Sequence, residues 1–174
     1  MLRFVVLAGL LFGGSGVSAS QAESAAADLK PEAARVVWIH DGDTITVDRS
    51  GTTEKVRLVG IDTPEVDDER PEFRAAAYAA RDYARSRLKG KTVTLEPDRY
   101  QPDRDGYGRL LRYVILDDGS DFNDEMVRKG YARVYDRFRF ASKPRFKSSE
   151  GDAKRKGLGV WTLPPGKWRS SSTF

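Results

Sequence analysis

The chain has 174 residues, of which 39% are hydrophobic and 32% are charged, and this composition excludes an intrinsically disordered protein. The length is enough for one domain with a sizeable core. There is no cysteine, which excludes a disulfide framework, a thiolate zinc site and a cysteine nucleophile. The net charge of +4 is uneven, because residues 128–174 contain 13 Lys and Arg but 3 Asp and Glu. This asymmetry favours a polyanionic partner, and a solvated basic tail is the alternative explanation.

The first 22 residues have the organisation of a secretory signal peptide. A basic start is followed by a short apolar run at 4–12 and by small polar residues, with cleavage expected near Ala19 or Ala22. We therefore expect an exported protein, either periplasmic or secreted. The alternative is an N-terminal membrane anchor, although the apolar run is short for a membrane span.

Hydrophobic periodicity predicts five strands and three helices in the remaining chain. The predicted strands are 33–39, 44–47, 55–61, 92–96 and 109–116. The predicted helices are 72–88, 120–129 and 148–156, with a basic loop at 138–147. The three tryptophans, Trp38, Trp161 and Trp168, are expected to be packing residues.

Three strands, a helix, two strands and further helices match the order of the five-stranded OB barrel. We therefore predict an α+β protein with an OB-fold domain at 33–163. A flexible lead-in at 23–32 precedes this domain, and a tail at 164–174 follows it.

Acidic side chains gather at the ends of two predicted neighbouring strands. Asp41 and Asp43 precede the strand 44–47, and Asp62 and Glu65 follow the next one. If these strands form a meander, the four carboxylates meet at one end of the sheet. Burying so many like charges is unfavourable unless a cation or fixed donors compensate for them. A hard divalent cation suits oxygen donors, because the chain has no thiol and a single histidine.

The candidate Ca²⁺ ligands are Asp43, Asp62 and the main-chain carbonyl of Thr63. Asp41 is either a further ligand or a group that orders a metal-bound water. Glu65 is the candidate general base, since it stands in a loop where it can activate a water. Taken singly, Asp43 and Asp62 are better explained as turn or cap residues, and the alternative for Glu65 is an exposed loop acid, so the prediction depends on their combination.

Two arginines complete the candidate site. Arg57 lies on a predicted strand, and Arg109 follows the loop Gly106-Tyr107-Gly108. Guanidinium groups form paired, charge-assisted hydrogen bonds with phosphate, and these strengthen as charge develops in a transition state. Tyr107 is suited to stacking on a base. The alternatives are a structural salt bridge for Arg57 and a loop aromatic that covers the barrel end for Tyr107.

Four motifs in this order resemble the staphylococcal (thermonuclease-type, micrococcal) nuclease family. They are I-H-D-G-D-T at 39–44, V-R-L-V-G-I-D-T-P-E at 56–65, D-G-Y-G-R-L at 105–110 and G-L-G-V-W at 157–161. The resemblance covers residues 33–161. It implies an OB-fold with three helices and a Ca²⁺-dependent phosphodiesterase that cleaves DNA and RNA with little sugar specificity and leaves 3′-phosphate ends.

The resemblance also implies a role for each matching position. The implied roles are Ca²⁺ ligands for Asp43, Asp62 and Thr63, phosphate-binding arginines for Arg57 and Arg109, the proposed general base for Glu65, a nearby acid of secondary importance for Asp41, and a tyrosine beside the bound nucleotide for Tyr107. The sequence departs from the family pattern at Gly106, where a lysine is frequent, at the acidic loop 67–69, and at 135–138, where stacking tyrosines are expected.

The competing interpretation is a non-catalytic OB module that binds nucleic acid or protein. Binding alone needs basic and aromatic groups, whereas this chain also carries clustered carboxylates beside two arginines. We therefore expect a monomeric nuclease with DNA and RNA as substrates.

Overall fold

A computed structural model describes residues 30–164; the predicted signal peptide, most of the lead-in and nearly all of the tail lie outside this range. Five strands form a closed barrel in the order β1-β2-β3-β6-β5, and a small second sheet pairs β4 with β7. The strands are β1 (Glu32–Ile39), β2 (Thr44–Arg49), β3 (Thr52–Leu58), β4 (Ile61–Asp62), β5 (Thr92–Pro97), β6 (Leu110–Ile115) and β7 (Arg133–Val134).

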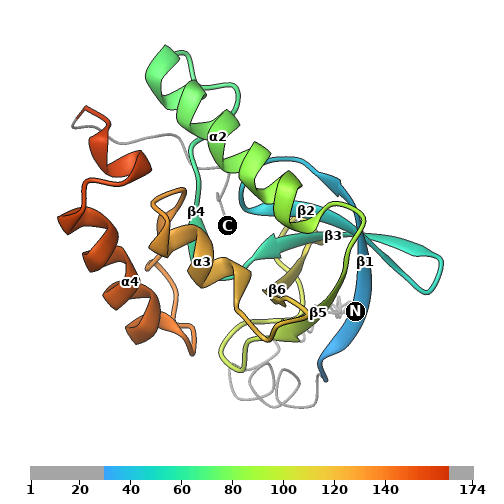
Figure 1. Ribbon diagram of the computed structural model, residues 1–174. Coiled ribbons are helices and arrows are strands. Elements are labelled where there is room, and N and C mark those ends of the chain that lie inside the picture. The colour runs from blue at the N-terminus through green and yellow to red at the C-terminus, as the bar shows by residue number, and fades with distance from the viewer. Residues whose placement is uncertain (1–29, 165–174) are drawn as a thin grey trace, which may run out of the picture.

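Three helices surround the barrel, so the predicted OB-fold is confirmed. They are α2 (Pro71–Leu88), α3 (Phe122–Arg128) and α4 (Lys143–Arg155), followed by the 3₁₀ turn η1 (Gly159–Thr162). α2 runs along the barrel, and α3 lies between the barrel and α4 (Figure 1). None of the helices within residues 30–164 combines the length and the apolar character that crossing a membrane requires.

The β2–β3 hairpin sets the position of the candidate site. Its turn is formed by Ser50 and Gly51, both with positive φ, which matches the twist of the flanking strands. The resulting antiparallel register places Thr44 opposite Arg57. β3 also pairs in parallel with β6, where Leu111 lies beside Arg57. The barrel therefore brings the ends of two hairpin strands and the start of β6 together.

The predicted strand 55–61 is interrupted, because β3 ends at Leu58 and β4 begins at Ile61. Gly60 lies between them with a φ of 77°, a conformation that side chains with a Cβ rarely adopt. A Cβ at this position would lie 2.6 Å from the ring of Phe140. This turn takes Asp62 out of the barrel and pairs it with Arg133 of β7.

α2 follows the predicted amphipathic pattern. Its buried stripe is Phe73, Ala77, Ala80, Ala84 and Leu88. The alanines allow a close approach to the turn before β2, since a Cβ on Gly42 would lie 2.9 Å from the Cβ of Ala80. The helix thus supports the segment that carries Asp41 and Asp43.

The predicted loop 138–147 is wrong at its end, because α4 already begins at Lys143 with a proline in its first turn. Phe146 gives this basic segment a buried anchor.

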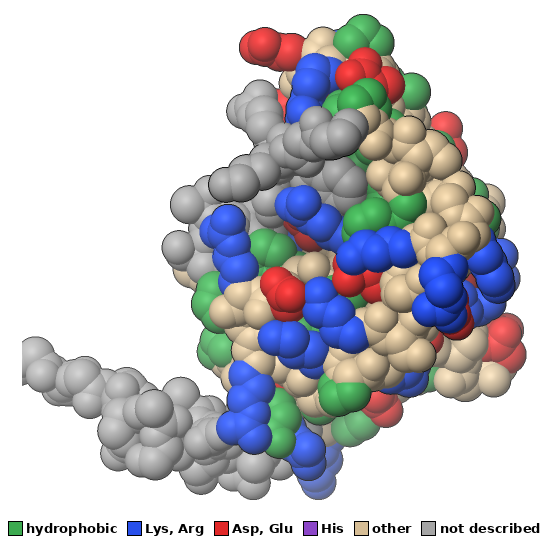
Figure 2. Space-filling model, turned by 90° about the vertical axis from the view of Figure 1, so that its left-hand side faces the viewer, with side chains coloured by type: hydrophobic (Ala, Val, Ile, Leu, Met, Phe, Trp, Pro, Cys, Tyr) green, Lys and Arg blue, Asp and Glu red, His purple; other side chains and the backbone are tan. Residues whose placement is uncertain are grey.

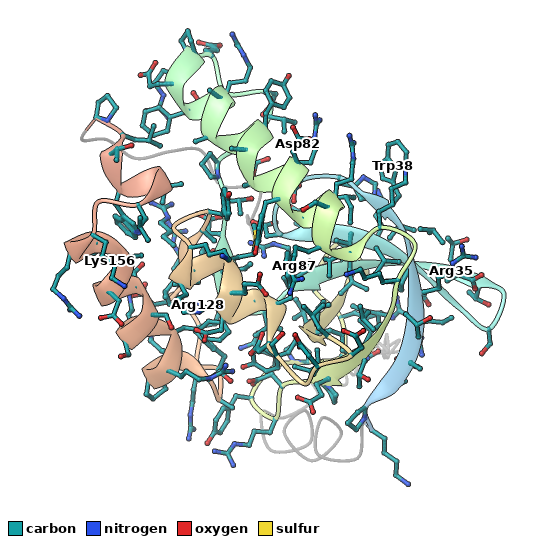
Figure 3. The ribbon with its side chains drawn as sticks, in the orientation of Figure 1. Arg35, Trp38, Asp82, Arg87, Arg128 and Lys156 are labelled. Carbon is teal, nitrogen blue, oxygen red and sulfur yellow. The ribbon has the colours of Figure 1, made fainter. Side chains whose placement is uncertain are left out.

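The prediction that Trp38 is a packing residue is also wrong, because Trp38 is 49% exposed and projects from β1 (Figure 3). A register shift between Val36 and Trp38 breaks the alternation of β1 and turns the indole outward.

Candidate active site

Arg57 stands at the centre of the predicted site. Its side chain is buried at the end of β3, and its Nη2 lies 3.3 Å from Oδ2 of Asp43 and 3.9 Å from Oδ1 of Asp62. Asp43 immediately precedes β2, and its main-chain oxygen accepts a hydrogen bond from the amide of Leu58 at 2.9 Å. The structure therefore brings the two acidic motifs together around one guanidinium.

Asp43 is fully enclosed by polar contacts. Its Oδ2 accepts from the amide of Thr63 at 2.9 Å and from the Thr63 hydroxyl at 3.2 Å, and its Oδ1 accepts from the Thr44 hydroxyl at 3.0 Å. Burial raises the pKa of Asp43 to about 7; Arg57 opposes this shift, and the charges of Asp41 and Asp62 add to it. Burial and the neighbouring carboxylates therefore both disfavour the charged form of Asp43.

Asp41 and Glu65 lie at the more open side of this group, and both are half-buried. Oδ1 of Asp41 accepts from the amide of Asp43 at 2.9 Å, which orders the turn before β2. Burial raises the pKa of Asp41, and the charge of Glu65 contributes to that increase. The Glu65 charge therefore acts on Asp41.

Arg133 belongs to the site, although the sequence interpretation missed it. Its Nε and Nη2 donate to Oδ2 of Asp62 at 3.0 and 2.8 Å, while its own side chain is 31% exposed. The contact arises because Asp62 and Arg133 are direct partners in the β4–β7 pair. The sequence around Arg133 gave no signal for this contact, because an arginine indicates no partner by itself.

Arg109 is held by a carboxylate that the sequence interpretation also missed. Its Nε donates to Oδ2 of Asp105 at 2.6 Å, and Oδ1 of Asp105 accepts from the amides of Tyr107 and Arg109. Nη2 of Arg109 is buried and has no hydrogen-bond partner within residues 30–164. Tyr107 is 62% exposed, with the Arg109 guanidinium 5.3 Å from its ring centroid. Arg109 therefore keeps an unused donor.

The acidic loop after Glu65 is partly neutralised by its own contacts. Asp68 is buried, and it accepts from the amide, Nε and Nη2 of Arg70 at 3.0, 2.9 and 2.8 Å. Asp67 and Glu69 remain exposed. Only part of the predicted negative charge of this loop therefore faces solvent.

The donor chemistry of the pocket fits a hard cation. Asp43 and Asp62 offer carboxylate oxygens at zero or nearly zero exposure, and Thr63, which directly follows Asp62, is buried as well. Within residues 30–164, no three or more His, Asp or Glu side chains are grouped as a metal site. A cation here would therefore combine two carboxylates with carbonyl and water oxygens, which is a donor set that Ca²⁺ accepts.

Comparisons with known proteins find related nucleases. The family model described as staphylococcal nuclease homologue matches residues 55–163. The thermonuclease of Staphylococcus intermedius is 34% identical over 139 residues, which are 77% of this chain and 79% of that protein. The micrococcal nuclease of Shigella flexneri is 33% identical over 161 residues, covering 84% and 83%. An uncharacterized endonuclease of Escherichia coli is 36% identical over 139 residues, covering 78% and 83%.

Proposed function

Because this chain belongs to the staphylococcal nuclease family and is a nuclease, we propose that it is an exported, Ca²⁺-dependent phosphodiesterase for DNA and RNA. It has little sugar specificity, leaves 3′-phosphate ends and acts as a monomer. The observation that carries the proposal is the buried cluster of Asp43, Arg57 and Asp62. A module that only binds nucleic acid has no need to bury two carboxylates around an arginine.

In this proposal Asp43 and Asp62, with the carbonyl of Thr63, would hold Ca²⁺, which supplies positive charge to the scissile phosphate and to a water. Glu65 orients that water and accepts its proton. Asp41 keeps the Asp43 turn in place through its contact with the Asp43 amide. Burial and, to a smaller extent, the charges of Asp41 and Asp62 raise the pKa of Asp43, and this supports the assignment because a cation would offset these effects.

Arg57 and Arg109 stabilise the phosphoryl oxygens as negative charge develops on them. The buried Nη2 of Arg109 supports this role, since an unpaired buried donor is unfavourable until an acceptor arrives. Tyr107 lies beside Arg109 with most of its ring exposed, so it is placed to stack on the base next to the bound phosphate. Residues 1–22 are removed on export, near Ala19 or Ala22.

The test uses the protein from residue 23 onward and the variant Asp43→Ala. Single-stranded DNA and RNA are incubated with each protein in Ca²⁺ or in chelator, and the product ends are analysed. We expect cleavage of both substrates that requires Ca²⁺ and Asp43, with 3′-phosphate products. The variant Asp152→Ala removes an exposed carboxylate on α4 and should cleave normally.

Two results would overturn the proposal. Cleavage that continues in chelator or without Asp43 would place the chemistry elsewhere. Salt-sensitive binding without any cleavage would instead identify a nucleic-acid-binding OB module, with Gly106 and the exposed acids of loop 67–69 as the first positions to restore.

A further inference from the structure

Two loops that follow β5 and β7 form a platform of three arginines and two aromatic rings. We define the platform as Arg99, Tyr100, Arg137, Phe138 and Arg139. The guanidinium of Arg139 lies 3.7 Å from the centroid of the Tyr100 ring, and that of Arg99 lies 4.7 Å from the same ring. Phe138 is 40% exposed. Bases stack on such rings and on guanidinium planes.

Hydrogen bonds connect the two loops, so the platform has a defined shape. Nε2 of Gln101 donates to the main-chain oxygen of Arg139 at 2.5 Å. Asp98, which is buried, accepts from the amide of Tyr100 at 2.7 Å through one oxygen and from the amide of Ala141 at 2.7 Å through the other. The Tyr113 hydroxyl also donates to Asp98, at 2.6 Å. One buried carboxylate therefore holds both loops.

The arginines of the platform differ from most others in this protein. Most described arginines form ion pairs with Asp or Glu, as Arg49, Arg87 and Arg104 do. Within residues 30–164, no ion pair involves the platform arginines. The neighbouring Asp136 pairs with Lys147 at 2.8 Å and so does not neutralise them. Lys and Arg side chains also gather over the middle of the α4 side of the molecule, with acidic side chains among them (Figure 2).

The platform continues from the proposed active site. A small, mostly apolar pocket is lined by Arg57, Gln101 and Phe138, among other residues. Gln101 directly follows Tyr100, whose ring lies 3.7 Å from the Arg139 guanidinium. The platform therefore borders a pocket that Arg57 also lines.

We propose that the platform binds the nucleotides of a single strand that lie beyond the scissile phosphate. Bases stack on the Tyr100–Arg139 pair, while the arginines contact backbone phosphates. The inference rests on the proposed nuclease function and adds that substrate length governs binding. A stacking position of this kind is worth on the order of tenfold in affinity.

The test compares oligonucleotides of about 4 and about 16 nucleotides, the range of sites on OB folds. Binding is measured by fluorescence anisotropy in a Glu65→Gln background, and kcat/KM is measured for the same lengths without that change. The double variant Tyr100→Leu, Arg139→Gln should bind the long strand roughly tenfold or more weakly and the short strand nearly as before. Its salt dependence for the long strand should also be shallower.

Arg35→Gln is the matched control, because Arg35 is another exposed arginine that forms no ion pair with any residue in 30–164, and it projects from β1 (Figure 3). It pairs with Thr92, at the opposite end of β5 from Arg99. We expect this variant to bind both strands like the parent. If the control and the double variant lost the same affinity for the long strand, the effect would be general charge attraction and the platform would be refuted.

The outcomes separate this inference from the proposed function. If the parent cleaves and the double variant binds the long strand as tightly as the parent does, only the platform is refuted. If the parent neither binds nor cleaves, the proposed function itself fails. Arg139→Gln alone retains the Tyr100 ring and the Gln101 contact to the main chain, so it carries the test if the double variant unfolds.

Discussion

Replacing Arg133 with glutamine should have opposite effects on stability and on cation binding. Arg133 donates two hydrogen bonds, at 3.0 and 2.8 Å, to one oxygen of the fully buried Asp62. Removing one partner of a buried ion pair costs about 3–5 kcal/mol. Because the Arg133 side chain is 31% exposed, we discount this loss to about 1–3 kcal/mol in the absence of Ca²⁺.

The same substitution should strengthen Ca²⁺ binding. In the proposed site a cation shares the Asp62 carboxylate with Arg133. The guanidinium therefore repels the cation and also occupies one of the two Asp62 oxygens that the cation would bind. Two unit charges 4 Å apart near a protein surface interact by about 4 kcal/mol. Water and salt at this partly exposed position screen most of that repulsion. We therefore expect Arg133→Gln to bind Ca²⁺ about tenfold more tightly.

Thermal unfolding in chelator and in Ca²⁺, together with calorimetric Ca²⁺ titration, measures both effects. The variant should melt at a lower temperature than the parent in chelator but gain more from added Ca²⁺. Arg128→Gln, an exposed arginine on α3, should change neither quantity. Unchanged or weaker Ca²⁺ binding in Arg133→Gln would refute the competition for Asp62. Unchanged stability in chelator would show that the ion pair contributes nothing to folding.

Three further substitutions test separate parts of the argument. Arg57→Lys keeps the charge but loses the planar guanidinium that forms paired hydrogen bonds, and we expect kcat on single-stranded DNA to fall about 100-fold or more. Near-normal turnover would show that Arg57 does not stabilise the transition state. Glu65→Gln should lower kcat in the same assay while the Ca²⁺ concentration for half-maximal rate stays nearly constant, whereas a large rise would make Glu65 a metal ligand. Gly60→Ala should lower the free energy of unfolding in urea by about 1–3 kcal/mol, because φ is 77° and Phe140 lies 2.6 Å from the new Cβ. Gly119→Ala has the same backbone strain in open space, so equal losses would exclude a packing effect of Phe140.

Local pattern accounts for the parts of the fold that the sequence predicted well. The stripe Phe73 to Leu88 repeats at helical spacing, and α2 has nearly the predicted bounds. The departures lie where a tertiary contact overrides the local pattern. The bulge in β1 turns Trp38 outward, and burial of Phe146 starts α4 earlier than its polar composition indicates.

By itself, the sequence determined the order of strands and helices and the residue types of the candidate site. These follow from periodicity and motif spacing, which are properties of neighbouring residues. Only the tertiary structure decided how each charge is paired. Asp62 meets Arg133, 71 positions away, because a turn at Gly60 directs β4 toward β7 rather than along the barrel. Such partners depend on the path of the chain in space, and no local pattern encodes them.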